Sequence, residues 1–174
     1  MSDSLDIRPE TADDREAVRR IHEAAFATPA EADLVEALRE SGASVPELCL
    51  VAAEGAEVVG HICFSRARLG ADGPEILALA PMAVEPGRQR RGIGSELVRE
   101  ALDRAEATEY PLVVVLGHPD YYPRFGFDPA SAYGVACPYD GVPPEAWMAY
   151  TLPAYRPGTR GTVAYAEAFT LSAP

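Results

Sequence analysis

The segment VEPGRQRRGIGSEL, residues 84–97, gathers three arginines and two closely spaced glycines between an apolar run and a helical pattern. A helix N-terminus leaves backbone N–H groups unpaired and carries the positive end of the helix dipole, so it attracts anions. Gly92 and Gly94 remove the side chains that would keep an anion away from that backbone, and the three arginines, Arg88 among them, add positive charge. The segment therefore predicts a cradle for a diphosphate, although an ordinary solvated turn stays open on this pattern alone.

The residues around this segment predict a βαβ unit. The apolar run EILALAPMAV, residues 75–84, suits a buried strand, and residues 95–110 repeat apolar positions at helical intervals. The run PLVVVLG, residues 111–117, suits a second buried strand. Parallel strands of this kind are joined by a right-handed crossover. Because Pro81 cannot donate to a strand ladder, we expect a bulge or a splayed pairing near it.

The other segments add antiparallel strands and two helices. We expect a strand near residues 5–8, helices at 11–26 and 30–42, an antiparallel hairpin at 48–55 and 57–69, and tail strands near 146–152 and 162–169. His22 is predicted on a helix surface, and His61 in the core or at a strand edge. The fold class is therefore α/β with a mixed (α+β) sheet, and residues 1–174 are expected to form a single domain.

Composition excludes several classes of protein. The chain has 174 residues and a formal net charge of -12, and all 15 of its basic residues are arginine. Without lysine, a Schiff-base mechanism and the lysine of a nucleoside-triphosphate loop are excluded. The acidic balance argues against nonspecific nucleic-acid binding and mildly favours a cationic partner. No apolar run is long enough to span a membrane, and the N-terminus lacks a targeting pattern, so a cytoplasmic protein is expected.

The three cysteines do not indicate a disulfide framework or a zinc site. Cys49, Cys63 and Cys137 are odd in number and far apart in the sequence, so buried structural thiols are expected. No spacing of ligand residues indicates a metal site either.

Two other phosphate-binding motifs do not fit the segment at 84–97. A dinucleotide fingerprint needs a third glycine or alanine where this chain has Leu97, and a tighter turn than residues 85–91 allow. A nucleoside-triphosphate loop needs the missing lysine. What remains is a Gln-x-x-Gly-x-Gly cradle on a βαβ unit.

Two motifs resemble the GNAT N-acetyltransferases. Gln89, Gly92 and Gly94 match, in order, the Gln/Arg-x-x-Gly-x-Gly/Ala pattern of that family's coenzyme A pyrophosphate loop. The segment YYPRFGF, residues 121–127, is similar to the family's Tyr-x-x-x-Gly-Phe segment after the following strand. The combination looks closest to a bacterial branch described as predicted N-acetyltransferases.

The resemblance implies acetyl-CoA as the acetyl donor and assigns a set of cofactor-binding residues. The amides of the turn would hold the diphosphate, and the exposed backbone at the end of the preceding strand would pair with the pantetheine arm. An amide of that strand could also face the thioester carbonyl. The set comprises Met82, Ala83, Val84, Gln89, Arg90, Arg91, Gly92, Ile93, Gly94 and Ser95.

The resemblance also indicates the catalytic residues. Tyr122 stands four residues before Gly126, where the family pattern places its general-acid tyrosine, although Tyr121 could exchange roles with it. Glu75 could act as the base, or could be a solvated carboxylate at a strand end. His118 follows the strand at 111–117 and could act as acid or base, but the family often has asparagine near that position.

The resulting prediction is an N-acetyltransferase that acts on a primary amine of a small molecule or peptide. Its alternative is a coenzyme A binding or sensing module without turnover. Neither a nucleic acid nor a membrane is expected as a partner, and a homodimer is left open.

Overall fold

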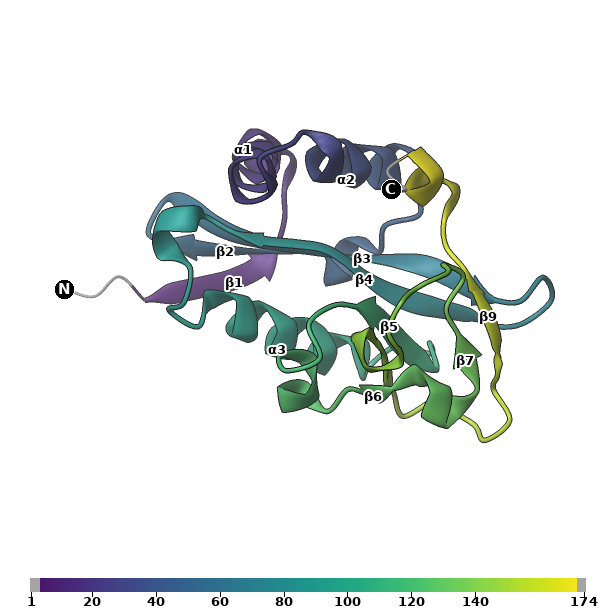
Figure 1. The fold of residues 1–174 in the computed structure, drawn as a ribbon. Coiled ribbons are helices and arrows are strands. Elements are labelled where there is room, and N and C mark those ends of the chain that lie inside the picture. The colour runs from purple at the N-terminus through teal and green to yellow at the C-terminus, as the bar shows by residue number, and fades with distance from the viewer. Residues whose placement is uncertain (1–3, 172–174) are drawn as a thin grey trace. The chain divides into compact units, whose positions relative to one another are not determined.

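The computed structural model describes residues 4–171, which divide into two compact units. The second unit consists of Ser65–Leu79 and Ala105–Ala166, and the first unit holds the remaining described residues. Strands β3 (Glu57–Leu69) and β4 (Glu75–Val84) contribute to both units (Figure 1).

The first unit contains antiparallel strands, as predicted. The strand order is β1-β2-β3-β4, and Leu50 of β2 pairs with Ile62 of β3 in the expected hairpin. The elements of this unit besides β3 and β4 are β1 (Leu5–Pro9), η1 (Ala12–Asp14), α1 (Arg15–Phe26), α2 (Ala30–Glu40), η2 (Pro46–Leu48), β2 (Leu50–Glu54), η3 (Pro86–Arg88), α3 (Ile93–Ala105) and η7 (Glu167–Leu171).

Helices cover both faces of these strands. Helices α1 and α2 lie on one face, and α3 lies on the other (Figure 1). The apolar stripe of the first two helices packs into a core made of Val18, Ile21, Val35, Val51, Val58 and Ala83. On the other face, a Cβ atom at Gly60 would stand 3.1 Å from Leu97 Cδ1 and 3.2 Å from Ile93 Cγ2. The glycine therefore allows α3 to approach the strand closely.

The second unit contains the predicted parallel pair. Leu77 of β4 pairs with Val113 of β5 (Leu112–Leu116) in parallel, whereas β5 and β8 (Trp147–Thr151) are antiparallel. This combination confirms the mixed sheet. The other elements are η4 (Tyr122–Phe125), β6 (Asp128–Pro129), η5 (Ala130–Tyr133), β7 (Val135–Ala136), η6 (Pro144–Ala146) and β9 (Gly161–Ala164). The core includes Leu69, Ile76, Leu112, Val114, Trp147 and Val163.

The bulge or splayed pairing expected near Pro81 stays a prediction. Within the described chain, the parallel register of β4 with β5 contains Leu77 and Ala78 and ends before the proline. The Ala80–Pro81 peptide bond is cis.

The C-terminal strand is shorter than predicted. The expected strand near residues 162–169 ends at Ala164, and Glu167–Leu171 forms a 3-10 turn instead. The reason is that this last segment packs against α2 of the first unit, with Ala168 buried. The helix predicted at 95–110 also ends early, at Ala105, whose carbonyl accepts a hydrogen bond from the Thr108 hydroxyl at 2.6 Å.

His22 does not lie on a helix surface, contrary to the prediction. Its side chain is fully buried, because its position falls on the same stripe of α1 as the core residue Val18. His22 Nε2 lies 2.9 Å from His61 Nδ1, and His61 Nε2 lies 3.3 Å from Glu10 Oε2. Arg39 donates two hydrogen bonds to the Glu10 carboxylate, at 3.0 and 2.8 Å. The core position predicted for His61 is confirmed.

Burial and neighbouring charges set the protonation of this chain of polar groups. Burial would raise the pKa of Glu10, but contacts with His61 and Arg39 outweigh it and lower the pKa to about 2. Burial, followed by the charge of His61, lowers the pKa of His22 to about 3. At neutral pH the network therefore combines an ionised carboxylate with a neutral His22.

Two of the three cysteines meet in the first unit. Cys49 and Cys63 are buried free thiols with their Sγ atoms 3.4 Å apart, and Cys137 is a half-buried free thiol in the second unit. The predicted burial is confirmed for Cys49 and Cys63, whereas Cys137 is only half-buried.

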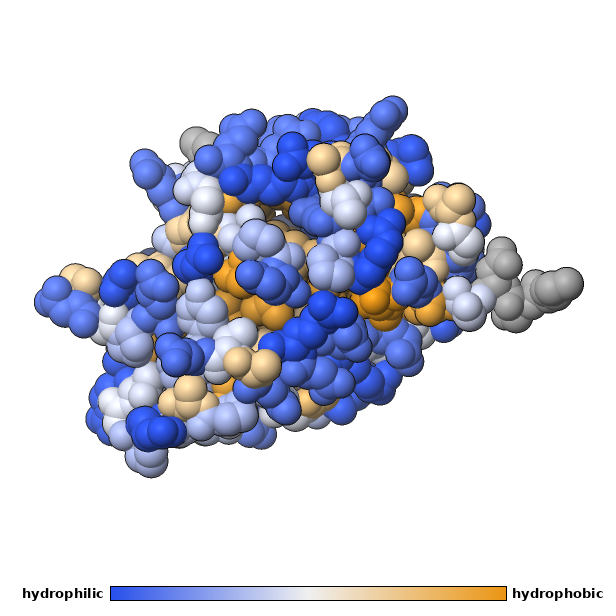
Figure 2. All heavy atoms as spheres, turned by 180° about the vertical axis from the view of Figure 1, so that it is seen from behind, coloured by the Kyte–Doolittle hydropathy of each residue, from blue (hydrophilic) through white to orange (hydrophobic). Residues whose placement is uncertain are grey.

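The surface is largely hydrophilic. Figure 2 shows polar and charged residues over most of one face. Among the described residues, Phe26 and Leu116 are the large hydrophobic residues with exposed side chains. Within residues 4–171, no helix combines the length and the hydrophobicity needed to cross a bilayer. Large apolar side chains thus lie mainly in the two cores.

The first prediction concerns His22. Because its pKa is lowered to about 3 in the fold, the unfolded chain binds the proton more readily below the ordinary pKa near 6.5. Stability is then lost as pH falls from about 6.5 toward 3, at about 1.4 kcal/mol per pH unit. Urea unfolding of the wild type should therefore show a loss of about 2 kcal/mol between pH 6.5 and pH 5.

His22→Gln keeps a polar group for His61 but removes the titration, so its unfolding free energy should depend much less on pH in this range. His118→Gln, at an exposed position, should behave like the wild type. An equal pH dependence in His22→Gln and the wild type would contradict the assignment.

Candidate active site

Backbone and side-chain hydrogen bonds fix the turn between β4 and α3. The Glu85 N–H donates to the Val59 carbonyl at 2.9 Å, and the Arg88 N–H donates to the Glu85 carbonyl at 2.8 Å. Gln89 Nε2 donates to the Val84 carbonyl at 3.1 Å. The glutamine of the predicted motif thus holds the turn against the end of β4.

The turn then enters α3 through two left-handed residues. Arg90 has φ +66° and Gly92 has φ +85°, a region that favours glycine. A Cβ atom at Gly92 would meet nothing within 4 Å, so its backbone lies open. The Glu96 N–H donates to the Gly92 carbonyl at 3.0 Å, which closes the first turn of the helix. The N–H groups of Ile93 and Gly94 precede this bond and have no acceptor within the helix.

These residues fit an anionic group such as a diphosphate. The helix N-terminus supplies N–H donors and the positive end of the dipole, and the open backbone at Gly92 lets an anion approach. Arg90 and Arg91 are exposed, and they make no ion pair with the part of the chain that the structure describes. Their charge is thus available at the turn. Coenzyme A carries such a diphosphate, so the residues of the turn fit this part of the cofactor.

Arg88 differs from the other two arginines of the turn. Its guanidinium forms ion pairs with Glu54, Glu57 and Glu85, and it is only 24% exposed. The sequence suggested that Arg88 adds positive charge to the cradle. The structure corrects this expectation, because three carboxylates surround that charge.

The end of β4 presents three further predicted residues. Met82 and Val84 are half-buried, whereas the Ala83 side chain is 5% exposed and belongs to the core of the first unit. The Val84 carbonyl is already an acceptor for Gln89. Contacts of this segment with a pantetheine arm would therefore come mainly from its backbone rather than its side chains.

In the second unit, Tyr122 sits in an aromatic cluster. Its ring is buried, at 8% exposure, and makes edge contacts with Tyr121 and Phe127 at centroid distances of 5.1 and 5.5 Å. It lies directly over Gly117, where a Cβ atom would stand 2.3 Å from Tyr122 Cε2. Gly117 thus makes room for the ring, a role that the sequence did not reveal.

The Tyr122 hydroxyl differs from the ring in its exposure to solvent. It makes no hydrogen bond with any described residue, yet it is not among the fully buried side-chain atoms of residues 4–171 that lack a hydrogen-bond partner. The hydroxyl therefore keeps some access to solvent. Burial, followed by the nearby Tyr121, raises the pKa of Tyr122 to about 12, so the group is a proton donor at neutral pH.

The two other predicted catalytic residues are more exposed. Glu75 begins β4, and its carboxylate lies 3.4 Å from Arg68 Nη2, with both side chains about half exposed. The His118 side chain is exposed, and its carbonyl accepts hydrogen bonds from the N–H groups of Tyr121 and Tyr122. Neither side chain is held in a buried environment of the kind that Tyr122 has.

Comparison with known proteins identifies the family. Residues 15–127 match the model of the acetyltransferase (GNAT) family. The chain belongs to the GNAT acetyltransferase family. It is therefore an acyltransferase, and the resemblance of the two motifs is confirmed. Among residues 4–171, no group of three or more His, Cys, Asp or Glu side chains is arranged to hold a metal ion.

Three relatives are similar over most of their length. The chain is 39% identical to the uncharacterized N-acetyltransferase YjhQ of Escherichia coli K12 over 143 residues, which is 79% of this chain and 78% of that protein. The crystal structure of the Escherichia coli GNAT protein YhbS in complex with CoA is similar with a TM-score of 0.88 at 32% identity, covering 95% of this chain and 92% of that one.

The third relative is a GNAT family acetyltransferase from Brucella melitensis in complex with acetyl-CoA. It matches with a TM-score of 0.79 and 32% identity, over 96% of this chain and 99% of that one. These likenesses agree with the mixed α/β fold described above.

The second prediction concerns the packing of the Tyr122 ring over Gly117. Because a Cβ atom at Gly117 would overlap the Tyr122 ring, Gly117→Ala should lower the free energy of unfolding by about 2 kcal/mol in urea titrations. Gly87→Ala is the matched control, since a Cβ atom there meets nothing within 4 Å. In a Tyr122→Ala background the effect of Gly117→Ala should largely vanish. An undiminished effect in that background would show that the strain lies elsewhere.

Proposed function

We propose that the chain transfers the acetyl group of acetyl-CoA to a primary amine of a small molecule or peptide by direct attack. The observation that carries this proposal is the open helix N-terminus at Gly92, in a chain of the GNAT family. Relatives bound to CoA and to acetyl-CoA support the choice of donor.

The turn into α3 holds the diphosphate in this proposal. The N–H groups from Arg90 to Ser95 and the side chains of Arg90 and Arg91 face the phosphoryl oxygens, while Gln89 keeps the turn in place. The backbone of Met82–Val84 binds the pantetheine arm, and an amide there donates to the thioester carbonyl oxygen, on which negative charge develops.

Tyr122 acts at the leaving group. The amine nitrogen attacks the carbonyl carbon, the carbon–sulfur bond breaks, and the departing thiolate receives a hydrogen bond or a proton from the Tyr122 hydroxyl. With its pKa raised to about 12, the phenol is a weaker acid than a thiol of ordinary pKa near ~8.5. The raised pKa favours stabilisation of the sulfur by hydrogen bonding over complete proton transfer. The free hydroxyl on a buried ring supports Tyr122 over Tyr121 in this role.

The base that accepts the amine proton is assigned to Glu75 or His118. Glu75 lies beside Arg68, whereas the His118 side chain is exposed and meets no described partner. Both groups can reach water, so an ordered water could carry the proton in either case. The net charge of -12 suits an amine acceptor that carries positive charge before it binds.

The third prediction compares two glycines of the turn. An alanine at φ +85° is strained by about 1 to 2 kcal/mol, so Gly92→Ala should shift the turn and weaken CoA binding by up to about tenfold in calorimetric titrations. Gly87→Ala also places a methyl group in open space, without the left-handed conformation, and should bind CoA like the wild type. Equal affinities for CoA in the two variants would show that the diphosphate does not bind at this turn.

The fourth prediction tests the role of Tyr122 at the leaving group. Tyr122→Phe keeps the buried ring and should lower kcat about a hundredfold while the affinity for CoA is retained. Tyr121→Phe is the matched control and should lose little activity. The assay follows thiol release with a panel of amines. If Tyr121→Phe were the inactive variant, the two tyrosines would exchange roles, and if no amine were turned over by the wild type, a binding module would replace the enzyme.

A further inference from the structure

Arg88 is the most highly paired arginine at the turn that leads into α3. Its Nη1 contacts Glu54, its Nη2 lies 2.8 Å from Glu57 Oε2, and its Nε lies 3.2 Å from Glu85 Oε2. Each of the three guanidinium nitrogens thus meets a different carboxylate. Arg88 lies at the end of η3, directly before Gln89.

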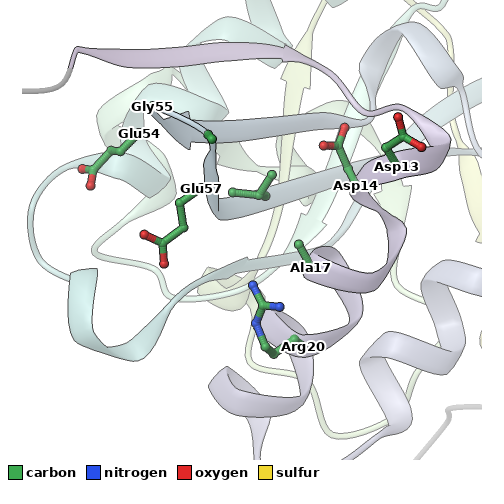
Figure 3. A pocket seen from close by; sticks show the side chains of 9 residues that line it. Asp13, Asp14, Ala17, Arg20, Glu54, Gly55 and Glu57 are labelled. Atoms are coloured by element: carbon green, nitrogen blue, oxygen red, sulfur yellow. The ribbon is translucent and has the colours of Figure 1, made fainter.

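Two of these carboxylates come from the turn between β2 and β3. Glu54 and Glu57 line a hollow of the first unit together with Asp13 and Asp14, but they point away from those two residues (Figure 3). Their carboxylates reach Arg88 instead, which joins the turn of one hairpin to the turn before α3. The hollow itself is lined mainly by acidic side chains.

We propose that Arg88 is a positioning residue that clamps the diphosphate turn to the β2–β3 turn, and that it is not a ligand of the phosphates. This inference rests on the proposed function of the turn. The formal charge of Arg88 with its three carboxylates is negative, because one positive charge faces three negative charges. Three carboxylates face the guanidinium, so a phosphate that approached its other N–H groups would meet repulsion from those carboxylates.

The clamp acts where the backbone needs support. Arg90 and Gly92, with φ +66° and +85°, lie two and four residues after Arg88, and a non-glycine residue such as Arg90 occupies this region only when its surroundings hold it. Gln89 fixes the turn to β4, and Arg88 fixes it to β3 and its turn. Together they present the N–H groups of α3 in one orientation before any ligand binds, which lowers the entropy cost of binding.

A carboxylate double variant separates a clamp from a phosphate ligand. If Arg88 bound the phosphates, Glu54→Gln/Glu57→Gln would free it and lower the KM for acetyl-CoA. If Arg88 is a clamp, the same variant loosens the turn and raises the KM, although it removes two negative charges near an anionic substrate. We expect a rise of about fivefold, with kcat unchanged, since each surface ion pair contributes little alone. A fall in KM would overturn the inference.

Substitutions of Arg88 complete the test. Arg88→Gln should raise the KM for acetyl-CoA by about fivefold at unchanged kcat, and Arg88→Lys should restore only part of the loss because it keeps the charge without the three-way geometry. The triple variant Arg88→Gln/Glu54→Gln/Glu57→Gln should be no worse than Arg88→Gln, because all of them break the same clamp. Additive losses would contradict a shared role.

Two further measurements separate this inference from the proposed function. S-acetylpantetheine lacks the diphosphate, so its KM should be the same for the wild type and Arg88→Gln. An equal rise for this donor would show a general disturbance and overturn the clamp. Gly92→Ala reports on the diphosphate turn itself, and the proposed function fails if this variant binds CoA like the wild type. If Gly92→Ala binds CoA more weakly while the KM of Arg88→Gln for acetyl-CoA is unchanged, only the clamp is overturned.

Discussion

The backbone conformation at the start of α3 is the constraint on which the candidate site depends. Helix N-termini attract anions in any protein, but their N–H groups are useful only when the preceding residues do not cover them. Here the left-handed Gly92 turns the chain away and leaves its own surroundings open. The glycine at Gly60 lets α3 pack closely on β3, so the helix that offers these donors is fixed to the core of the first unit.

The charge of the exposed arginines at this turn differs in sign from the net charge of the chain. An acidic chain would repel an anion over long distances, yet two exposed arginines stand at the helix N-terminus while the third is surrounded by carboxylates. Arginine suits both tasks, since its planar fork can bind several oxygens at once and remains charged. Within the described chain, arginine therefore supplies charge that is not ion-paired at Arg90 and Arg91, and ion pairs that connect two turns at Arg88.

The sequence predicted those features that depend on local pattern. Apolar periodicity located β4 and α1, and the glycine motif located the helix N-terminus, because each depends on residues close together in the chain. The sequence-based prediction was wrong for His22, because a polar residue was expected on the helix surface although its position lies on the buried stripe of α1. The partners of Arg88 on the β2–β3 turn and the packing of the Tyr122 ring over Gly117 depend on tertiary contacts, which local sequence pattern does not reveal.

Tyr122 shows how packing changes the chemistry that a motif implies. The motif alone supplies a phenol of ordinary acidity, close to that of a thiol, and suggests simple proton donation. Burial of the ring over Gly117 raises its pKa to about 12 and so weakens it as an acid, but the same packing fixes the direction in which the hydroxyl points. In the proposed mechanism, a fixed donor of this kind loses little entropy when sulfur becomes its acceptor. The contribution that we propose for Tyr122 then comes from orientation, since a tyrosine with a raised pKa can still be an effective hydrogen-bond donor to a leaving thiolate.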